Sequence, residues 1–128
     1  MRASEYTIFK TKAAARLKLN PPESEFQLGC VMLNIASAVG EKQYDWQNKI
    51  TVKFGVNDVT NIIFGIRSNQ EVSLFHQFGE TSKRVVFKPG DKGWFLTVND
   101  KSIPISYPEI LAINIMLEHA LPLMHNWK

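Results

Sequence analysis

The sequence has 128 residues, the usual size of one domain, and a hydrophobic fraction of 45%, which excludes a chain disordered throughout. The formal net charge of +3 fits a polyanionic partner but is also common among enzymes. The single cysteine, Cys30, excludes an internal disulfide; within its apolar run we expect it to be a small buried side chain.

No targeting or membrane segment is evident in the sequence. No apolar stretch is long enough for a transmembrane helix, so we expect no membrane partner. The first residues, Met1–Glu5, lack the apolar core of a signal peptide. The location stays open, because a cytoplasmic or nucleoid protein and a processed organellar form both fit.

Alternating apolar and polar residues predict strands in the first part of the chain. Within the first strand, Leu17 and Leu19 face the core, while Arg16 and Lys18 form a basic outer face. In the last strand, one face carries four large apolar residues: Trp46, Ile50, Val52 and Phe54. The expected strands span Tyr6–Leu19, Leu28–Val39 and Tyr44–Phe54.

A short helix and a second set of strands follow. Asn57 or Asp58 can cap the helix, whose apolar stripe comprises Val59, Ile62, Ile63 and Ile66. Further strands are expected over Val72–Phe78, Lys83–Lys88, Gly93–Asn99 and Lys101–Ile105. Pro104 cannot donate a backbone hydrogen bond, so the last of these strands is expected at a sheet edge.

The final element is predicted to be a helix. Ser106 and Glu109 form a capping box, Pro108 lies in the first turn, and Pro122 should kink the last turn. One stripe comprises Ile110, Ile113, Leu117, Leu121 and Met124, and outside it lie Leu111, Ile115 and Met116. A helix so apolar usually buries two sides. In a chain this short, the second side indicates contact with another subunit.

We expect the overall order to be four strands, a helix, four strands and a helix, although the alternation delimits only three strand ranges before the first helix. We expect an α+β fold in a single domain over residues 1–128, because no linker or low-complexity segment divides the chain.

The sequence contains none of the short motifs that usually mark an enzyme. His119 and His125 are six residues apart on the expected helix, so they do not share a face as a metal pair would. No zinc-protease, paired-cysteine or phosphate-loop motif is present. We predict no catalytic residue, metal, cofactor or small-molecule substrate; a carboxylate cluster of the nuclease type is the enzymatic alternative.

Basic and aromatic residues alternate on several expected strands, as in proteins that bind single-stranded nucleic acid. Those expected to contact phosphates are Lys10, Lys12, Arg16, Lys49, Lys53, Lys83 and Arg84. Those expected to stack on bases are Tyr6, Phe9, Tyr44, Trp46, Phe75 and Trp94. For each aromatic residue, burial in the core is the alternative, and Trp46 is the weakest candidate because Ile50 and Val52 share its expected face.

Four segments resemble the Whirly family in order and spacing. Tyr6–Ala14 resembles the family's Tyr-x-Ile/Leu-Tyr-Lys-Gly-Lys-Ala-Ala segment, and Lys42–Lys49 is similar to its Arg-Gln-Tyr-Asp-Trp-Ser-x-Lys signature. Phe75-His76 matches the Phe-His of its fifth strand, and Leu121–Trp127 resembles its Leu/Met-Pro-Tyr-Leu-x-Gly-Trp ending. This chain departs from the family at Thr11, where the family has Gly, and at Ala15, where it has Leu.

The resemblance implies two antiparallel four-stranded sheets packed crosswise, with two helices that serve oligomerisation. It also implies a fourfold homotetramer that binds single-stranded DNA without strong sequence preference, in repair, recombination, replication or transcriptional regulation. The residues expected at the oligomer interface are Leu117, Leu121, Met124 and Trp127.

Two non-enzymatic alternatives stay open. The expected fold also resembles that of kinetoplastid mitochondrial guide-RNA-binding proteins, which would make RNA the partner. The other alternative is a structural or partner-binding oligomer whose basic strands are only a solvated surface.

Overall fold

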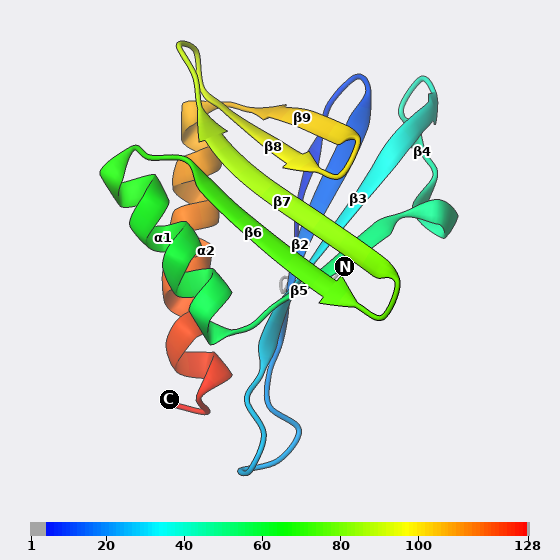
Figure 1. The fold of residues 1–128 in the computed structure, drawn as a ribbon. Helices are drawn as coiled ribbons and strands as arrows, with labels where there is room; N and C mark the ends of the chain where they lie inside the picture. The colour runs from blue at the N-terminus through cyan, green and yellow to red at the C-terminus, as the bar shows by residue number, and fades with distance from the viewer. Residues whose placement is uncertain (1–4, 128) are drawn as a thin grey trace.

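The first sheet comes from the N-terminal part of the chain (Figure 1). The computed structural model describes residues 5–127, so Met1–Ser4 and Lys128 of the expected domain lie outside the described residues. The central strand, β3, pairs antiparallel with β2 on one side and with β5 and the short β4 on the other. The strands are β1 (Glu5–Phe9), β2 (Ala13–Asn20), β3 (Cys30–Gly40), β4 (Gln43–Tyr44) and β5 (Ile50–Phe54).

The strand expected over Tyr6–Leu19 is in fact a hairpin, so this prediction is wrong. The chain reverses after β1, where the backbone N–H of Lys10 donates to the carbonyl of Ala13 at 2.9 Å. The turn contains no Gly, Pro or Asn, the usual markers of a reversal. The predicted alternation within β2 is confirmed: Leu17 is buried and Arg16 lies on the other face.

The strand expected over Tyr44–Phe54 is also interrupted. A single 3₁₀ turn, η1 (Trp46–Asn48), separates β4 from β5. Within this turn, the Asn48 amide donates to the Asp45 carboxylate at 2.8 Å, a local bond that competes with strand pairing. Trp46 therefore does not share the core-facing side of Val52 and Phe54, although the alternation had predicted that it would.

The second sheet follows the prediction closely. It has the strand order β6-β7-β8-β9, with all neighbours antiparallel. Pro104 lies in the edge strand β9, as expected from its missing donor. The strands are β6 (Val72–Phe78), β7 (Thr81–Pro89), β8 (Trp94–Val98) and β9 (Lys101–Ile105).

Two helices connect and cover the sheets. The first, α1 (Val56–Ser68), begins after Gly55 and not at Asn57 or Asp58; the Asp58 carboxylate instead accepts the N–H of Gly55 at 3.2 Å. The second, α2 (Tyr107–Met124), has the predicted capping box of Ser106 and Glu109. Among residues 5–127, no helix is long and apolar enough to cross a membrane.

The core lies where the inner faces of the two crossing sheets meet the helices. Figure 1 shows α1 and α2 side by side along one flank, with the second sheet crossing the first. Fully buried side chains from both sheets and both helices fill this space, including Phe54, Ile62, Phe87, Ile103 and Ile113. The predicted fold class of two antiparallel sheets packed crosswise with two helices is confirmed, except that β4 adds a fifth short strand to the first sheet.

Candidate nucleic-acid interface

An aromatic cluster lies on the outer face of the first sheet. The rings of Phe9 and Tyr44 are 5.6 Å apart between centroids, and those of Tyr44 and Trp46 are 6.4 Å apart. The Tyr44 hydroxyl donates to the carbonyl of Lys10 at 2.6 Å, which ties the short β4 to the β1–β2 turn. This bond brings together three rings from two distant segments of the sequence.

Two small residues leave room for this cluster. Ala14 and Ala36 are directly opposite each other on β2 and β3, and Phe9 is the partner of Ala14 on β1. Both alanines are fully buried although they belong to the face that points away from the core, which indicates that larger neighbours cover them. Phe9 remains 61% exposed, so its ring is available to a ligand.

Arg16 extends the cluster with a positive charge. Its guanidinium carbon lies 4.1 Å from the centroid of the Trp46 ring, a cation–π contact. The Arg16 Nε also approaches the Thr7 hydroxyl at 3.4 Å and the Glu5 carboxylate at 3.7 Å. The guanidinium is thus held over an aromatic ring, where it can meet a phosphate or extend a stack of bases.

A cleft of about 890 Å³ adjoins the aromatic cluster. It lies between the β1–β2 turn, the β3–β4 turn and the edge strand β9. Lys10, Lys12 and Lys42 supply positive charge, and the second sheet contributes Ser102 and Pro104. A cleft with aromatic and cationic walls is the kind of surface on which single-stranded nucleic acid binds.

Lys10 has a second role in holding the fold. Its ammonium lies 2.7 Å from the carboxylate of Glu109, the residue that caps α2. Burial raises the pKa of the Glu109 carboxyl, but hydrogen bonds from Lys10 and Ser106 outweigh it and hold that pKa below its ordinary value. A phosphate that binds Lys10 must therefore compete with this ion pair.

Two further predicted residues lie on the outer face of the second sheet. Phe75 and Arg84 are cross-strand partners on β6 and β7, and both are exposed. Phe95, on β8, is 49% exposed on the same face. Phe95 also lines a pocket with Lys10 and Pro104, which belong to the cleft beside the aromatic cluster, so this surface adjoins that cleft.

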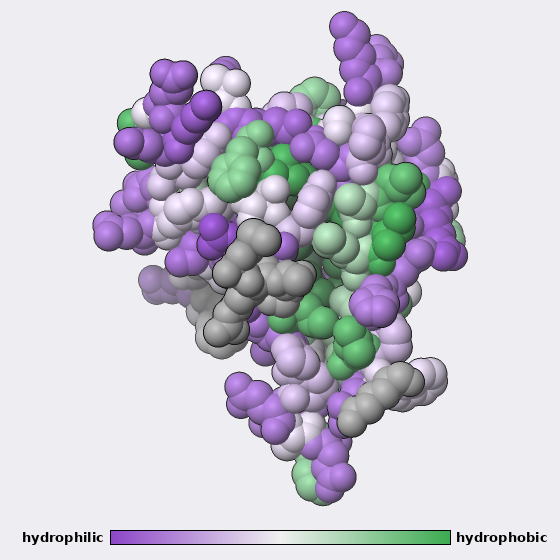
Figure 2. All heavy atoms as spheres, turned by 180° about the vertical axis from the view of Figure 1, so that it is seen from behind, coloured by the Kyte–Doolittle hydropathy of each residue, from purple (hydrophilic) through white to green (hydrophobic). Residues whose placement is uncertain are grey.

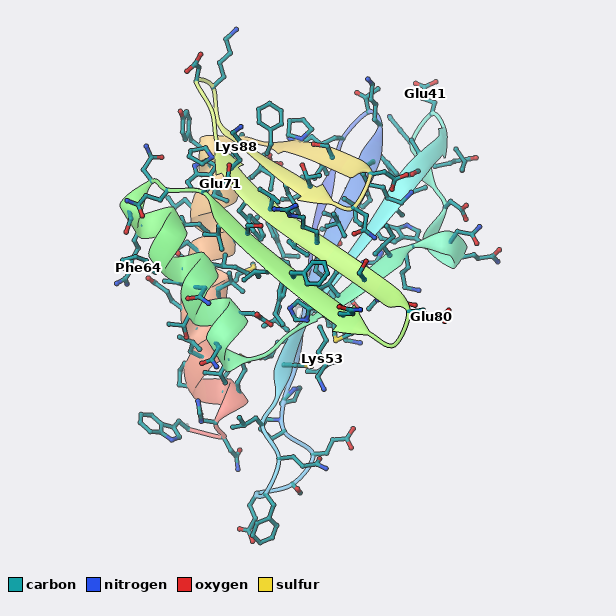
Figure 3. All side chains as sticks on the ribbon, viewed as in Figure 1. Glu41, Lys53, Phe64, Glu71, Glu80 and Lys88 are labelled. Carbon is teal, nitrogen blue, oxygen red and sulfur yellow. The ribbon has the colours of Figure 1, made fainter. Side chains whose placement is uncertain are left out.

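Lys53 and Lys83 come together at a different place, where β5 approaches β6 and β7. Both line a cavity of about 580 Å³ together with His76. The ammonium of Lys83 donates to the carbonyl of Thr51 and so bridges the two sheets. Figure 3 shows Lys53 below the ends of β6 and β7, with Glu80 marking their turn.

Three predicted contact residues lie elsewhere. Trp94 is only 3% exposed and belongs to the core, so its ring offers no free face for a base. Tyr6 faces α2 across a groove, where burial first, and then the negative charge of Glu109, raise the pKa of its hydroxyl. Lys49 is exposed, and its ammonium lies 3.3 Å from the carbonyl of Trp46.

The residues expected at the oligomer interface divide in two. Leu117 is 2% exposed and Met124 is fully buried, so both pack mainly inside their own subunit and offer little surface to another, contrary to the expectation for these two. Leu121 is half-buried, and Trp127 is 70% exposed.

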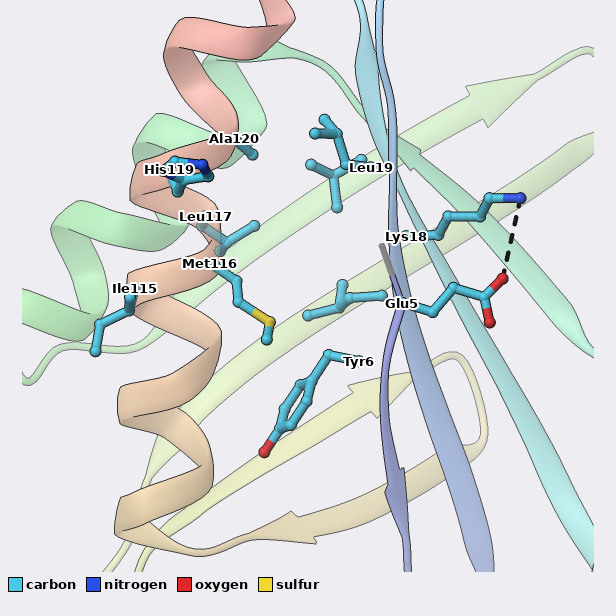
Figure 4. Close-up of a pocket in the computed structure, with 11 residues that line it drawn as sticks. Glu5, Tyr6, Lys18, Leu19, Ile115, Met116, Leu117, His119 and Ala120 are labelled. Carbon is cyan, nitrogen blue, oxygen red and sulfur yellow. Dashed lines mark ion pairs between the residues drawn. The ribbon is translucent and has the colours of Figure 1, made fainter. Parts of the chain in front are cut away.

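The free apolar surface of α2 lies on its other side. Leu111, Ile115 and Met116 are 58%, 55% and 43% exposed. Figure 2 shows apolar side chains gathered along the flank where α2 lies. A groove of about 360 Å³ runs between α2 and the first sheet, and Figure 4 shows Met116 and Leu117 across it from Tyr6 and Leu19.

Sequence reasoning missed several residues of these surfaces. Lys42 was not among the predicted contact residues, although Tyr44 and Trp46 nearby were, because a cation in a turn gives no periodic signal. Phe95 could have been found, because the alternation that buries Trp94 and Leu96 places it on the opposite face. Within residues 5–127, no three His, Cys, Asp or Glu side chains gather as a metal site requires.

Comparison with known proteins gives one consistent result. The model of the Whirly transcription factor family matches residues 8–117. The chain is 28% identical over 150 residues to the chloroplastic single-stranded DNA-binding protein WHY1 of Solanum tuberosum, and 26% identical over 152 residues to the mitochondrial single-stranded DNA-binding protein WHY2 of Arabidopsis thaliana. Each match covers 95% of this chain but only 54% and 63% of the relatives, so the chain spans between half and two thirds of their length.

The fold is shared as well. The crystal structure of WHY3 from Arabidopsis thaliana superposes with a TM-score of 0.84 at 24% identity, covering 99% of this chain and 91% of that one. The crossed sheets and flanking helices are thus those of a solved Whirly structure.

Proposed function

Because the chain belongs to the Whirly family, we propose that it binds single-stranded DNA with little sequence preference, as a homotetramer. The observation that carries the proposal is the cluster of Phe9, Tyr44 and Trp46, with the Arg16 guanidinium stacked on the last ring. Every base has an aromatic face, so stacking on such a cluster tolerates any sequence. Duplex DNA hides those faces, and single strands should therefore be preferred.

The adjoining cleft supports the same proposal. Lys12 and Lys42 are exposed on its walls, where they can neutralise phosphates of a strand whose bases stack on Phe9. Lys10 contributes when the strand displaces Glu109. The other cationic surfaces, around Arg84 and around Lys83, would bind the strand further along its path.

The exposed side of α2 supports assembly into a homo-oligomer. Leu111, Ile115 and Met116 form an apolar surface beside the groove, and apolar surfaces of this kind commonly mark protein interfaces. A cyclic tetramer buries one such surface per subunit and closes without leaving a free copy of it. The strand-binding faces then lie on four equivalent subunits.

The cellular role proposed is the binding and protection of exposed single strands, in repair, recombination, replication or transcriptional regulation. The two named relatives are single-stranded DNA-binding proteins, which supports the binding part of this proposal. The basic, sequence-tolerant surface is suited to it because it requires no recognition of base edges.

Fluorescence anisotropy of a labelled oligonucleotide tests the proposal. The single strand, its duplex and its RNA version should be titrated across a salt series. We expect tight binding of the single-stranded DNA, weak binding of the duplex, and affinity that falls with salt with a slope of about −0.7 per neutralised phosphate. Absence of binding at low salt would contradict the proposal. Tighter binding of the RNA version than of the DNA strand would indicate that RNA is the partner.

A further inference from the structure

The cavity between β5 and the β6–β7 hairpin contains a cluster of charges that the aromatic cluster does not use. It has a volume of about 580 Å³ and is lined by Lys53, His76 and Lys83, together with Asp58 at the start of α1. The remaining lining residues are Val52, Gly55 and Thr81. Four different elements, β5, α1, β6 and β7, therefore bring three basic side chains and one acid to one place.

The positive charge in this cavity exceeds the negative charge. His76 and Lys83 are directly opposite each other on β6 and β7, which places both side chains on one face. The half-buried Lys83 ammonium donates to the Thr51 carbonyl, one acceptor for three N–H donors. Among the described residues, no carboxylate lies within ion-pair distance of Lys53 or Lys83.

The single acid of the cavity is already engaged. The Asp58 carboxylate lies 3.1 Å from His76 Nε2 and also accepts the Gly55 N–H at 3.2 Å. A neutral His76 ring that donates from Nε2 to Asp58 has its other nitrogen, Nδ1, unprotonated. A second proton would go to Nδ1 and add both a positive charge and a donor to the cavity.

We propose that this cavity is a phosphate-binding site, and that His76 takes up a proton from solvent at Nδ1 when the phosphate binds. Lys53 and Lys83 supply two positive charges, and an anion between them favours the charged form of the neighbouring imidazole. The charged groups facing His76 are Asp58 from α1, Lys53 from β5 and Lys83 from β7, with Glu80 in the adjacent turn. That a DNA strand supplies the phosphate rests on the proposed function; the site itself does not.

The direct test uses inorganic phosphate as the probe. Proton–carbon correlation spectra of the three imidazoles should be recorded from pH 5.5 to 8.5, in phosphate and in chloride of equal ionic strength, with His76 assigned by His76→Gln. We expect phosphate to shift the His76 resonances saturably and to move its titration to higher pH, while His119 and His125 do not respond. No response of His76, or an equal response of all three rings, would overturn the proposal.

Two substitutions separate the site from a general charge effect. Lys83→Met should abolish the phosphate response of His76, whereas Lys92→Met, at an exposed lysine of the β7–β8 turn, should leave it intact. Circular dichroism and thermal unfolding establish that each variant is folded. A Lys83→Met protein that folds and keeps the full response would also overturn the proposal.

A third measurement identifies the source of the phosphate. If a strand provides it, affinity for a thymidine oligonucleotide should increase as pH falls from 8 to 6, by at most about tenfold per pH unit for one linked proton. His76→Gln should remove this dependence and His119→Gln should not. If inorganic phosphate binds but the oligonucleotide affinity is equally pH-dependent in both variants, the site takes free phosphate and the strand runs elsewhere.

Discussion

The ring of Phe9 is the most accessible part of the aromatic cluster, with 61% of its surface exposed. Its neighbours are more constrained: Tyr44 is hydrogen-bonded through its hydroxyl, and Trp46 lies under Arg16. A substitution at Phe9 therefore removes a stacking surface with the least disturbance to the fold.

We expect Phe9→Leu to weaken binding of a thymidine oligonucleotide by the stacking free energy of one base, about 1–3 kcal/mol. The unfolding midpoint should change little, because the ring is mostly in solvent. Anisotropy titration measures the first effect and urea unfolding the second. The matched control is Phe26→Leu, since Phe26 is 90% exposed in the β2–β3 loop. Equal affinities of the two variants would remove Phe9 from the binding surface.

Burial also explains for which residues the sequence predicted the correct face, inner or outer. Arg16 was placed on an outer face by alternation with Leu17, and the structure agrees. Alternation also places the neighbours Trp94 and Phe95 on opposite faces of β8, and the core buries the face that carries Trp94, Leu96 and Val98. On α2, by contrast, Leu117 was expected at the oligomer interface but is buried, whereas Ile115 is exposed.

At the scale of elements, the start of α2 connects the fold to the proposed binding surface. The Ser106 hydroxyl accepts the Glu109 N–H at 3.2 Å, and the Glu109 carboxylate accepts the Ser106 N–H at 2.9 Å. The same carboxylate pairs with Lys10 of the β1–β2 turn. The cap therefore anchors one wall of the cleft as well as the helix.

This arrangement predicts an acid-dependent loss of stability. The pKa of Glu109 is lower in the folded chain than its ordinary value of 4.5, so the stabilisation is complete above pH 4.5 and is lost as the pH falls through the folded pKa. Urea unfolding between pH 3 and 7 should show a smaller acid loss for Glu109→Gln than for the unmodified chain. Glu71→Gln, at an exposed position, is the control. Identical pH profiles for both variants would contradict the prediction.

Elements with strong local signals were predicted well. β9 has the predicted bounds, because the Asn99-Asp100 turn and Pro104 mark both its start and its edge position. The β1–β2 break was missed because its residues carry no strong turn signal, and the turn is held in part by another segment, through the bond of the Ala38 N–H to the Lys12 carbonyl at 2.9 Å. The β4–β5 break does have a local signal, the Asp45 and Asn48 side chains that bond each other, but the apolar alternation on either side of it was read as one strand.

On the scale of the whole molecule, α2 has two apolar sides with different roles. Leu117 faces the core of its own subunit, whereas Ile115 is exposed near the groove beside Tyr6. In the proposed tetramer, a neighbouring copy of the chain buries this exposed side.

Two substitutions only two residues apart on α2 should therefore behave differently. Ile115→Glu places a charge on the exposed side and should yield folded monomers. Leu117→Ala opens a cavity in the core and should lower the free energy of unfolding by about 2–5 kcal/mol. Sedimentation velocity and circular dichroism distinguish the two results. If Ile115→Glu remains fully tetrameric, this side of α2 is not the interface.

The sequence by itself determined the fold class, the cap of α2 and the resemblance to the Whirly family, because these follow from local patterns: periodicity, capping residues and the Gln43-Tyr44-Asp45-Trp46 segment. Only the tertiary structure decided which residues form a site. It brought Phe9 beside Tyr44, laid Arg16 on Trp46, and placed His76 in one cavity with Lys53. A pattern specifies which residues share a face, but what covers that face depends on how distant elements pack across it.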